Sequence, residues 1–166
     1  MSKALDFYLD LCSSGAIEKD QNQIDLLTEL EIFLSNSDEN IFSKIFKFSS
    51  QENSLTCFYL HGNVGSGKTL LMDLISKVIL SKKLMRIHFH EFMIKTHNSL
   101  HELRAKNYSK DDLIASYAKM IQLETDIIFF DEFQVTNIAD AMILSQLFTE
   151  FFNRKIKIVL TTNIFP

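Results

Sequence analysis

The stretch His61–Asp73, which reads HGNVGSGKTLLMD, constrains the fold more than any other part of the chain. The whole chain has only four glycines, and three of them fall within this stretch. From Gly62 to Thr69 the spacing is G-x-x-x-x-G-K-T, in which glycines allow backbone N–H groups to curl around a polyphosphate. An apolar run at 55–60 precedes the glycines and helical periodicity follows them. The pattern therefore predicts a strand, a phosphate-binding loop and a helix.

The residue types of this loop suit ATP and Mg²⁺. Lys68 would place a positive charge at the β and γ phosphates, and the Thr69 hydroxyl would bind the metal ion. The following helix, at about 68–80, would direct the positive end of its dipole at the same anion. A glycine-rich turn without a ligand is the alternative. The residues expected to hold the nucleotide are Gly62, Asn63, Val64, Gly65, Ser66, Gly67, Lys68, Thr69 and Leu70.

Strands and helices alternate through the rest of the chain. Apolar runs predict strands at 55–60, 85–90, 126–130 and 155–162. Helical periodicity predicts helices at 68–80, 92–104, 109–123 and 138–153. Such alternation is typical of an α/β fold with a parallel sheet and helices on both faces. We expect residues 55–166 to form this P-loop NTPase core.

The first 54 residues have a different pattern. Helical periodicity is present at 4–12, 21–35 and 39–48, with Gly15 ending the first helix and Asp20 capping the second. A polar linker follows at 49–54. We interpret residues 1–54 as a short helical N-terminal region leading into the core, not as an independent domain.

Two acids end the most apolar strand, in the sequence DIIFFDEF. Open α/β sheets bind ligands at the carboxyl ends of their strands. Asp131 would hold Mg²⁺, and Glu132 would act as the general base for the attacking water. The fourth strand ends in VLTTN, and Asn163 is the candidate for orienting that water. The alternatives are an acid pair that ends a strand at the surface and a polar loop residue.

All five histidines lie between residues 61 and 101. His88 and His90 are expected to alternate on one strand face, and His97 and His101 to stand at i, i+4 on one helix face. Zinc ligands are one interpretation. The pattern is not H-E-x-x-H and no cysteine has a matching spacing. Packing, hydrogen bonding or partner contact is therefore the favoured role.

Composition limits the compartment and the partners. The formal net charge of −4 makes nucleic acid an unlikely ligand, although a local basic groove is compatible with it. Two cysteines are too few for a disulfide framework and fit a reducing compartment. No signal peptide, transit pattern or apolar run long enough for a membrane span is visible. We expect a cytoplasmic protein.

Four strings together resemble the AAA+ ATPases of the ZapE cell-division family, which includes the mitochondrial lactation-elevated ATPases. They are GNVGSGKTLLMD, RIHFHEFMIKTHNSLHELR, FFDEFQVTNIADAMILSQLF and TTNIFP. The resemblance covers 55–166 and, more loosely, a D-x-x-Q start at Asp20. It implies that Lys68 and Thr69 are Walker A residues, Asp131 and Glu132 Walker B residues, and Asn163 sensor one.

The resemblance also implies partners. These are the bacterial division-ring protein FtsZ or a client in mitochondrial protein quality control. A ring of several copies of the chain is a further expectation, and since the segment after the second strand often faces the central pore in ring-forming P-loop ATPases, Phe92 and Met93 would there touch a threaded substrate. The family pattern differs from this chain at three positions, Ser66, Asn137 and Asp112, and none of these differences touches the catalytic chemistry directly. Family members continue with an arginine finger, a fifth strand and a helical lid. We therefore expect 55–60 at an exposed sheet edge, weak ATP binding and poor hydrolysis.

Three functions compete on these observations. The first is an AAA+ ATPase, or a fragment of one, that couples ATP hydrolysis to remodelling of a protein partner. The second is a nucleotide-dependent interaction module without turnover. The third is a DNA-associated loader of the replication type, whose DNA binding would depend on salt.

Overall fold

Four short strands form one parallel sheet. They are β1 (Cys57–His61), β2 (Leu84–His88), β3 (Ile127–Asp131) and β4 (Lys157–Thr162), in the spatial order β1-β4-β3-β2. The structure is a computed structural model and describes residues 3–35, 56–79, 83–109 and 112–164. Each predicted strand overlaps an observed one, with ends shifted by at most two residues. The predicted parallel sheet is confirmed.

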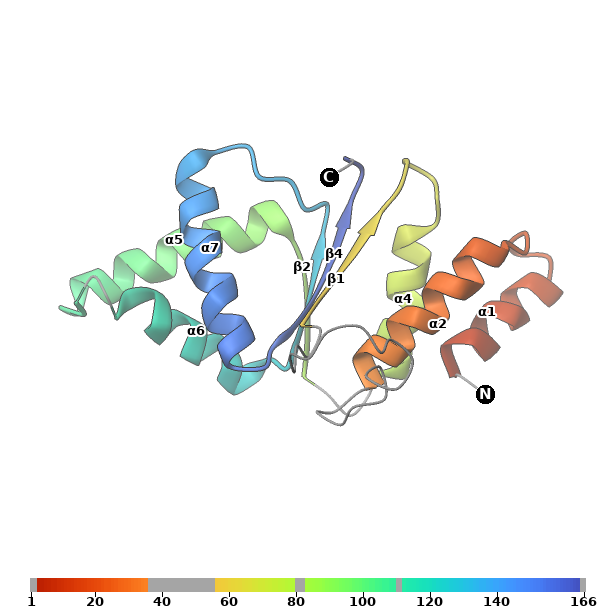
Figure 1. The fold of residues 1–166 in the computed structure, drawn as a ribbon, viewed down its shortest axis with the longest axis horizontal. Helices are drawn as coiled ribbons and strands as arrows, with labels where there is room; N and C mark the ends of the chain where they lie inside the picture. Colours follow the sequence, from red (N-terminus) through yellow and green to blue (C-terminus); the bar gives the residue numbers. More distant parts are fainter. Residues whose placement is uncertain (1–2, 36–55, 80–82, 110–111, 165–166) are drawn as a thin grey trace, which may run out of the picture.

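Helices cover both faces of the sheet (Figure 1). One face carries α1 (Lys3–Ser13), α2 (Gln21–Ser35) and α4 (Lys68–Val78); the other carries α5 (Phe89–Ala105), α6 (Leu113–Glu124) and α7 (Ile138–Asn153). None of the helices in the described ranges is both long and apolar enough to cross a membrane.

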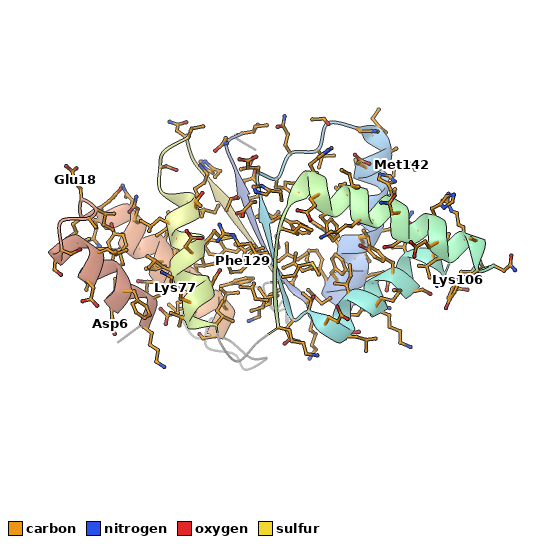
Figure 2. All side chains as sticks on the ribbon, turned by 180° about the vertical axis from the view of Figure 1, so that it is seen from behind. Asp6, Glu18, Lys77, Lys106, Phe129 and Met142 are labelled. Atoms are coloured by element: carbon orange, nitrogen blue, oxygen red, sulfur yellow. The ribbon has the colours of Figure 1, made fainter. Side chains whose placement is uncertain are left out.

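Strand β3 lies between two apolar cores. Its side chains alternate, so that Ile127 and Phe129 pack with α1, α2 and α4, whereas Ile128 and Phe130 pack with α5, α6 and α7. In Figure 2, Phe129 lies at the centre of the molecule between the two helical layers. Burial on both faces explains why this strand is a continuous apolar run.

The N-terminal helices share the core of the α4 face. Tyr8 and Leu27 are fully buried in the same cluster as Phe129. Gly15, with a φ of 75°, ends the first helical segment, and the Asp20 carboxylate accepts the backbone N–H of Asn22 at 2.8 Å to cap α2. Both features agree with the predictions. The predicted helix at 39–48 and the linker at 49–54 lie outside the described residues.

The junction of β2 and α5 differs from the prediction. Helix α5 begins at Phe89, directly after β2, so His90 is helical and does not share a strand face with His88. The physical reason is burial. Phe89, Phe92 and Met93 have the i, i+3, i+4 spacing of one helix face and all enter the core. Since Phe92 and Met93 are only 2% and 3% exposed, the prediction that they touch a threaded substrate is also wrong.

Strand β1 forms one edge of the sheet among the described residues, with β4 as its hydrogen-bonded neighbour. The predicted edge position is confirmed for this part of the chain. The order β1-β4-β3 also puts the end of β4 between the end of β1 and the end of β3. The three segments with predicted site residues therefore leave the sheet at adjacent positions along one edge (Figure 1).

Candidate functional site

The glycine-rich loop joins β1 to α4 and closes around the Lys68 side chain. The Lys68 ammonium donates hydrogen bonds to the backbone oxygens of Gly62 at 2.7 Å and Asn63 at 2.9 Å. Gly65 and Gly67 have φ values of 83° and 85°, in the left-handed region that side-chain-bearing residues rarely adopt. The loop therefore depends on glycine at these two positions for its tight curl.

A second layer of contacts holds the loop from the N-terminal helices. The Gln23 side-chain NH₂ of α2 donates to the Ser66 backbone oxygen at 3.1 Å. The buried Tyr8 hydroxyl of α1 donates in turn to the Gln23 side-chain oxygen at 2.9 Å. A methyl group at Gly67 would lie only 2.5 Å from the Gln23 nitrogen. The sequence analysis did not predict Tyr8 or Gln23 as site residues, although Gln23 ends the D-x-x-Q string.

A cavity of about 640 Å³ opens beside the loop. Its walls come from two sources: the segment 17–21 with Gln23, and three residues of the loop and the start of α4, namely Gly65, Gly67 and Leu70. The cavity therefore combines polar groups with the apolar side chain of Leu70 next to the predicted phosphate cradle. Sites for small molecules and cofactors commonly have this concave, mixed character.

The acid pair lies at the end of β3. Asp131 is its last residue, and the carboxylate accepts a hydrogen bond from Nε of Arg86 on β2 at 2.8 Å. Arg86 also forms an ion pair with Asp73 of α4. Burial opposes the charge on Arg86, but its hydrogen bonds to Asp73 and Asp131 outweigh that effect and raise its pKa above the ordinary value. Arg86 was not predicted as a site residue.

Glu132 has an unusual backbone conformation, with a φ of 56°. Its N–H donates to the Thr161 hydroxyl at 3.2 Å, and the N–H of Phe133 donates to the Thr161 backbone oxygen at 2.7 Å. These bonds to β4 hold the turn after β3 in place. Left-handed residues other than glycine cost roughly 1–3 kcal/mol and cluster at functional sites. The strain therefore supports a functional role for this position.

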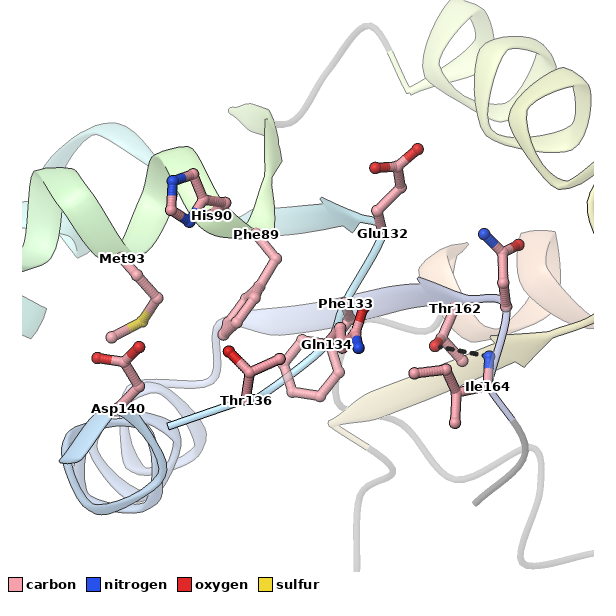
Figure 3. A pocket seen from close by; sticks show the side chains of 11 residues that line it. Phe89, His90, Met93, Glu132, Phe133, Gln134, Thr136, Asp140, Thr162 and Ile164 are labelled. Carbon is pink, nitrogen blue, oxygen red and sulfur yellow. Dashed lines mark hydrogen bonds between the residues drawn. The ribbon is translucent and has the colours of Figure 1, made fainter. Parts of the chain in front are cut away.

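A second cavity, of about 360 Å³, lies beside the ends of β3 and β4 (Figure 3). Glu132 and Asn163 both line it, together with polar and aromatic residues of α5, α7 and the turn after β3. In Figure 3 the Glu132 carboxylate points away from Thr136 and Asp140. The cavity gives water access to both residues predicted to act on it.

The structure brings the predicted residues to one edge of the sheet without joining all of them by contacts. The Lys68 ammonium is bonded to its own loop, and the Asp131 carboxylate to Arg86. No hydrogen bond or ion pair between described residues links Lys68 to Asp131 or Glu132. The structure therefore shows where these side chains lie, and the roles predicted for them remain predictions.

Two side chains have the chemistry of magnesium ligands. Mg²⁺ prefers hard oxygen donors such as carboxylates and hydroxyls. Thr69, in the first turn of α4, is exposed and its hydroxyl makes no hydrogen bond among the described residues. Asp131 uses one carboxylate oxygen for Arg86, and no hydrogen bond to its other oxygen is seen in the same part of the chain. The residues present thus fit the ion.

The histidines do not gather into a metal centre within residues 3–35, 56–79, 83–109 and 112–164, where no group of three potential ligands is found. His97 and His101 do share the helix α5, as predicted. The Nε2 atom of His97 lies 2.8 Å from a carboxylate oxygen of Asp140 on α7. This contact links two helices of one face.

The chain resembles known proteins over most of its length. It is 41% identical over 122 residues, or 69% of the chain, to lactation elevated protein 1 homolog B of Danio rerio, and 32% identical over 173 residues, or 96%, to cell division protein ZapE of Escherichia coli. It spans 24% and 45% of the lengths of these relatives.

A solved structure, domain III of the Thermotoga maritima replication initiation protein DnaA, matches 66% of this chain and 45% of its own length, with 21% identity and a TM-score of 0.48. The model of the AFG1-like ATPase family matches residues 5–166. The chain therefore belongs to the AFG1-like ATPase family.

Proposed function

We propose that this chain binds ATP with Mg²⁺ and hydrolyses it to ADP and phosphate. The observation that carries the proposal is the loop with two glycines in the left-handed backbone region. This loop lies at the carboxyl edge of a parallel sheet, beside Asn163 and the Asp131–Glu132 pair. Membership of an ATPase family supports it. A cytoplasmic location, where ATP and Mg²⁺ are available, is part of the same proposal.

Each residue has a stated task. Backbone N–H groups of the segment 62–70 surround the phosphates, and the Lys68 ammonium exchanges the loop carbonyls for phosphate oxygens when ATP enters. Thr69 and Asp131 hold Mg²⁺, which neutralises charge on the transferred phosphoryl group. The cavity next to Gly65 and Gly67 receives the nucleoside.

Hydrolysis requires a water molecule aligned with the terminal phosphate. Glu132 accepts the proton of that water as general base, and Asn163 orients it through hydrogen bonds. Both side chains line the cavity of about 360 Å³, from which water reaches the edge of the sheet. A residue with the left-handed backbone of Glu132 cannot continue the strand, so β3 ends before it and the Glu132 carboxylate stays at the end of β3.

The test compares four forms of the chain: the native sequence, Lys68→Ala, Glu132→Gln and the control Lys77→Ala, which removes an exposed lysine from the same helix. ATP affinity and phosphate release are measured separately. We expect Lys68→Ala to lose binding and Lys77→Ala to match the native chain. Glu132→Gln is expected to keep binding and lose about 10²–10⁴-fold in phosphate release, as for removal of a general base.

The same assay separates the alternatives. An interaction module without turnover would bind ATP and capture a protein partner equally well as the native chain and as Glu132→Gln, with no phosphate released before capture. Salt-dependent DNA binding would show the loader function. If the native chain and Lys68→Ala bind ATP equally, the phosphate cradle is wrongly assigned and the proposal fails.

We extend the proposal to a protein partner because one relative is named as a cell division protein. The chain would couple ATP to remodelling of that partner, with FtsZ as the first candidate and copies of the chain itself as ring neighbours. Glu132→Gln with ATP should retain the partner in a pull-down, and Lys68→Ala should not. Equal capture by both variants would contradict coupling to ATP.

A further inference from the structure

Arg86 connects two acids from different elements near the proposed metal site. Its Nε donates to the Asp131 carboxylate at 2.8 Å, and its terminal nitrogen Nη1 pairs with Asp73. The side chains of Arg86, Asp131 and Asp73 are 25%, 16% and 50% exposed, respectively. The contact to Asp131 is therefore shielded from water on most sides, whereas Asp73 lies at the rim.

The sheet register explains how Arg86 reaches Asp131. Arg86 on β2 is the register partner of Phe129 on β3, and Asp131 lies two residues beyond Phe129. All three side chains consequently project from the same face of the sheet. Because Phe129 packs in the core beneath α4, this is the face that carries the glycine loop and its helix.

The helix geometry explains why Asp73 matters to the metal site. Thr69 and Asp73 are four residues apart in α4, so they lie on the same face of the helix, one turn from each other. The Arg86 guanidinium thus ties the second turn of α4 to the end of β3. Thr69 and Asp131, the two proposed magnesium ligands, belong to the two elements that it joins.

We propose that Arg86 is a positioning residue for the magnesium site: it holds one oxygen of Asp131, leaves the other for the cation or its bound water, and aligns the acid with Thr69 through Asp73. This inference rests on the proposed ATP–Mg²⁺ function. Removing a group that hydrogen-bonds to a metal ligand and orients it commonly changes metal affinity or activity by about 10–100-fold.

The charges of the cluster suit this task. Asp73 and Asp131 carry two negative charges and Arg86 one positive charge, which leaves one net negative charge for the cation. The planar guanidinium offers its Nε and Nη1 donors in fixed relative positions, so one side chain can bond to both carboxylates. A lysine ammonium lacks that fixed fork, and Arg86→Lys is expected to replace it only partly.

The experiment measures ADP affinity by calorimetry, first with EDTA and then with excess Mg²⁺, for the native chain, Arg86→Gln, Arg86→Lys, Asp73→Asn and the control Arg104→Gln. Arg104 is an exposed arginine in the last turn of α5. Melting temperatures are recorded for every form. The quantity of interest is the ratio of the two affinities, which isolates the contribution of the metal ion.

We expect Mg²⁺ to tighten ADP binding by the native chain and by Arg104→Gln to the same degree. Arg86→Gln should reduce that tightening by about 10–100-fold and leave ADP affinity in EDTA unchanged. Arg86→Lys should retain part of it, and Asp73→Asn should lose less of it than Arg86→Gln. If Arg86→Gln does not fold, Arg86→Lys and Asp73→Asn decide the question.

Three results would overturn the inference. A parallel fall of affinity in EDTA and in Mg²⁺ would mean that Arg86 only stabilises the fold. Stronger Mg²⁺ dependence in Arg86→Gln would mean that the guanidinium competes with the cation. An unchanged ratio in the variants would mean that Arg86 has no role at the metal site. Failure of the native chain to bind ADP at all is a separate outcome, which would refute the proposed function first.

Discussion

The close approach of Gln23 to the glycine-rich loop predicts an unusually costly substitution, Gly67→Ala. Gly67 has a φ of 85°, and an added methyl group would lie 2.5 Å from the Gln23 nitrogen. That nitrogen ends a flexible side chain and can move, but moving it breaks its hydrogen bond to the Ser66 backbone oxygen and the hydrogen bond from the buried Tyr8 hydroxyl to the oxygen of the same amide. The substitution therefore affects the loop and its support together.

The magnitude can be divided into two parts. A left-handed backbone costs a residue with a side chain roughly 1–2 kcal/mol relative to glycine. Displacing Gln23 breaks two hydrogen bonds, at about 0.5–1.5 kcal/mol each. We expect Gly67→Ala to lower the free energy of unfolding by about 2–5 kcal/mol in total.

Two other glycines serve as matched controls. Gly65 and Gly15 have φ values of 83° and 75°, and no atom lies within 4 Å of a methyl group added at either position. Each of these alanine variants should cost only the backbone part, about 1–2 kcal/mol. Gly15→Ala should leave ATP affinity unchanged, since Gly15 lies outside the loop. Urea unfolding and equilibrium ATP binding would be measured for all three.

A double substitution tests the assigned cause. Gln23→Ala removes the group that the new methyl would strike, so Gly67→Ala should cost about 1–2 kcal/mol in that background, as at Gly65. If the effects of the two substitutions add independently, Gln23 is not the cause of the extra cost. Equal destabilisation by Gly67→Ala and Gly15→Ala would lead to the same conclusion.

Burial raises the pKa of the Cys57 thiol to about 11. In a Cys12→Ser background, alkylation of Cys57 at pH 8 should therefore be on the order of 10²-fold slower in the folded chain than in urea, and equal rates would contradict burial. Any stability that the neutral thiol contributes should be lost as pH rises from about 9 toward 11. The Asn137 side chain caps α7 by accepting the Ala139 N–H at 2.7 Å, and Asn137→Ala should lower the free energy of unfolding by about 1 kcal/mol, whereas Asn153→Ala at the other helix end should not. Glu132→Gly should raise the free energy of unfolding by up to about 1 kcal/mol, because it relieves the left-handed strain, and it should abolish phosphate release. Glu132→Gln should change the free energy of unfolding by less than about 0.5 kcal/mol. A destabilised Glu132→Gly variant would argue against strain at this position.

Local patterns were enough to predict much of the fold. The glycine spacing identified the loop between β1 and α4, and periodicity located α7 at its observed bounds. Both depend on neighbours within a few residues along the chain, where the geometry of helix and strand is repetitive. The prediction was wrong at the junction of β2 and α5, where the two-residue period of a strand and the roughly 3.6-residue period of a helix both fit the sequence. The alternation of His88 and His90 suggested a strand, but burial of Phe92 and Met93 favours a helix from Phe89.

Residue patterns along the chain were thus enough to predict the parallel α/β architecture, the glycine-rich loop and the placement of Asp131, Glu132 and Asn163 at strand ends. The residues that support them became visible only in the folded chain. Gln23 meets Ser66 across 43 positions and Arg86 meets Asp131 across 45. The physical reason is that local periodicity specifies which face a side chain occupies, whereas its partner depends on how separate elements pack in space.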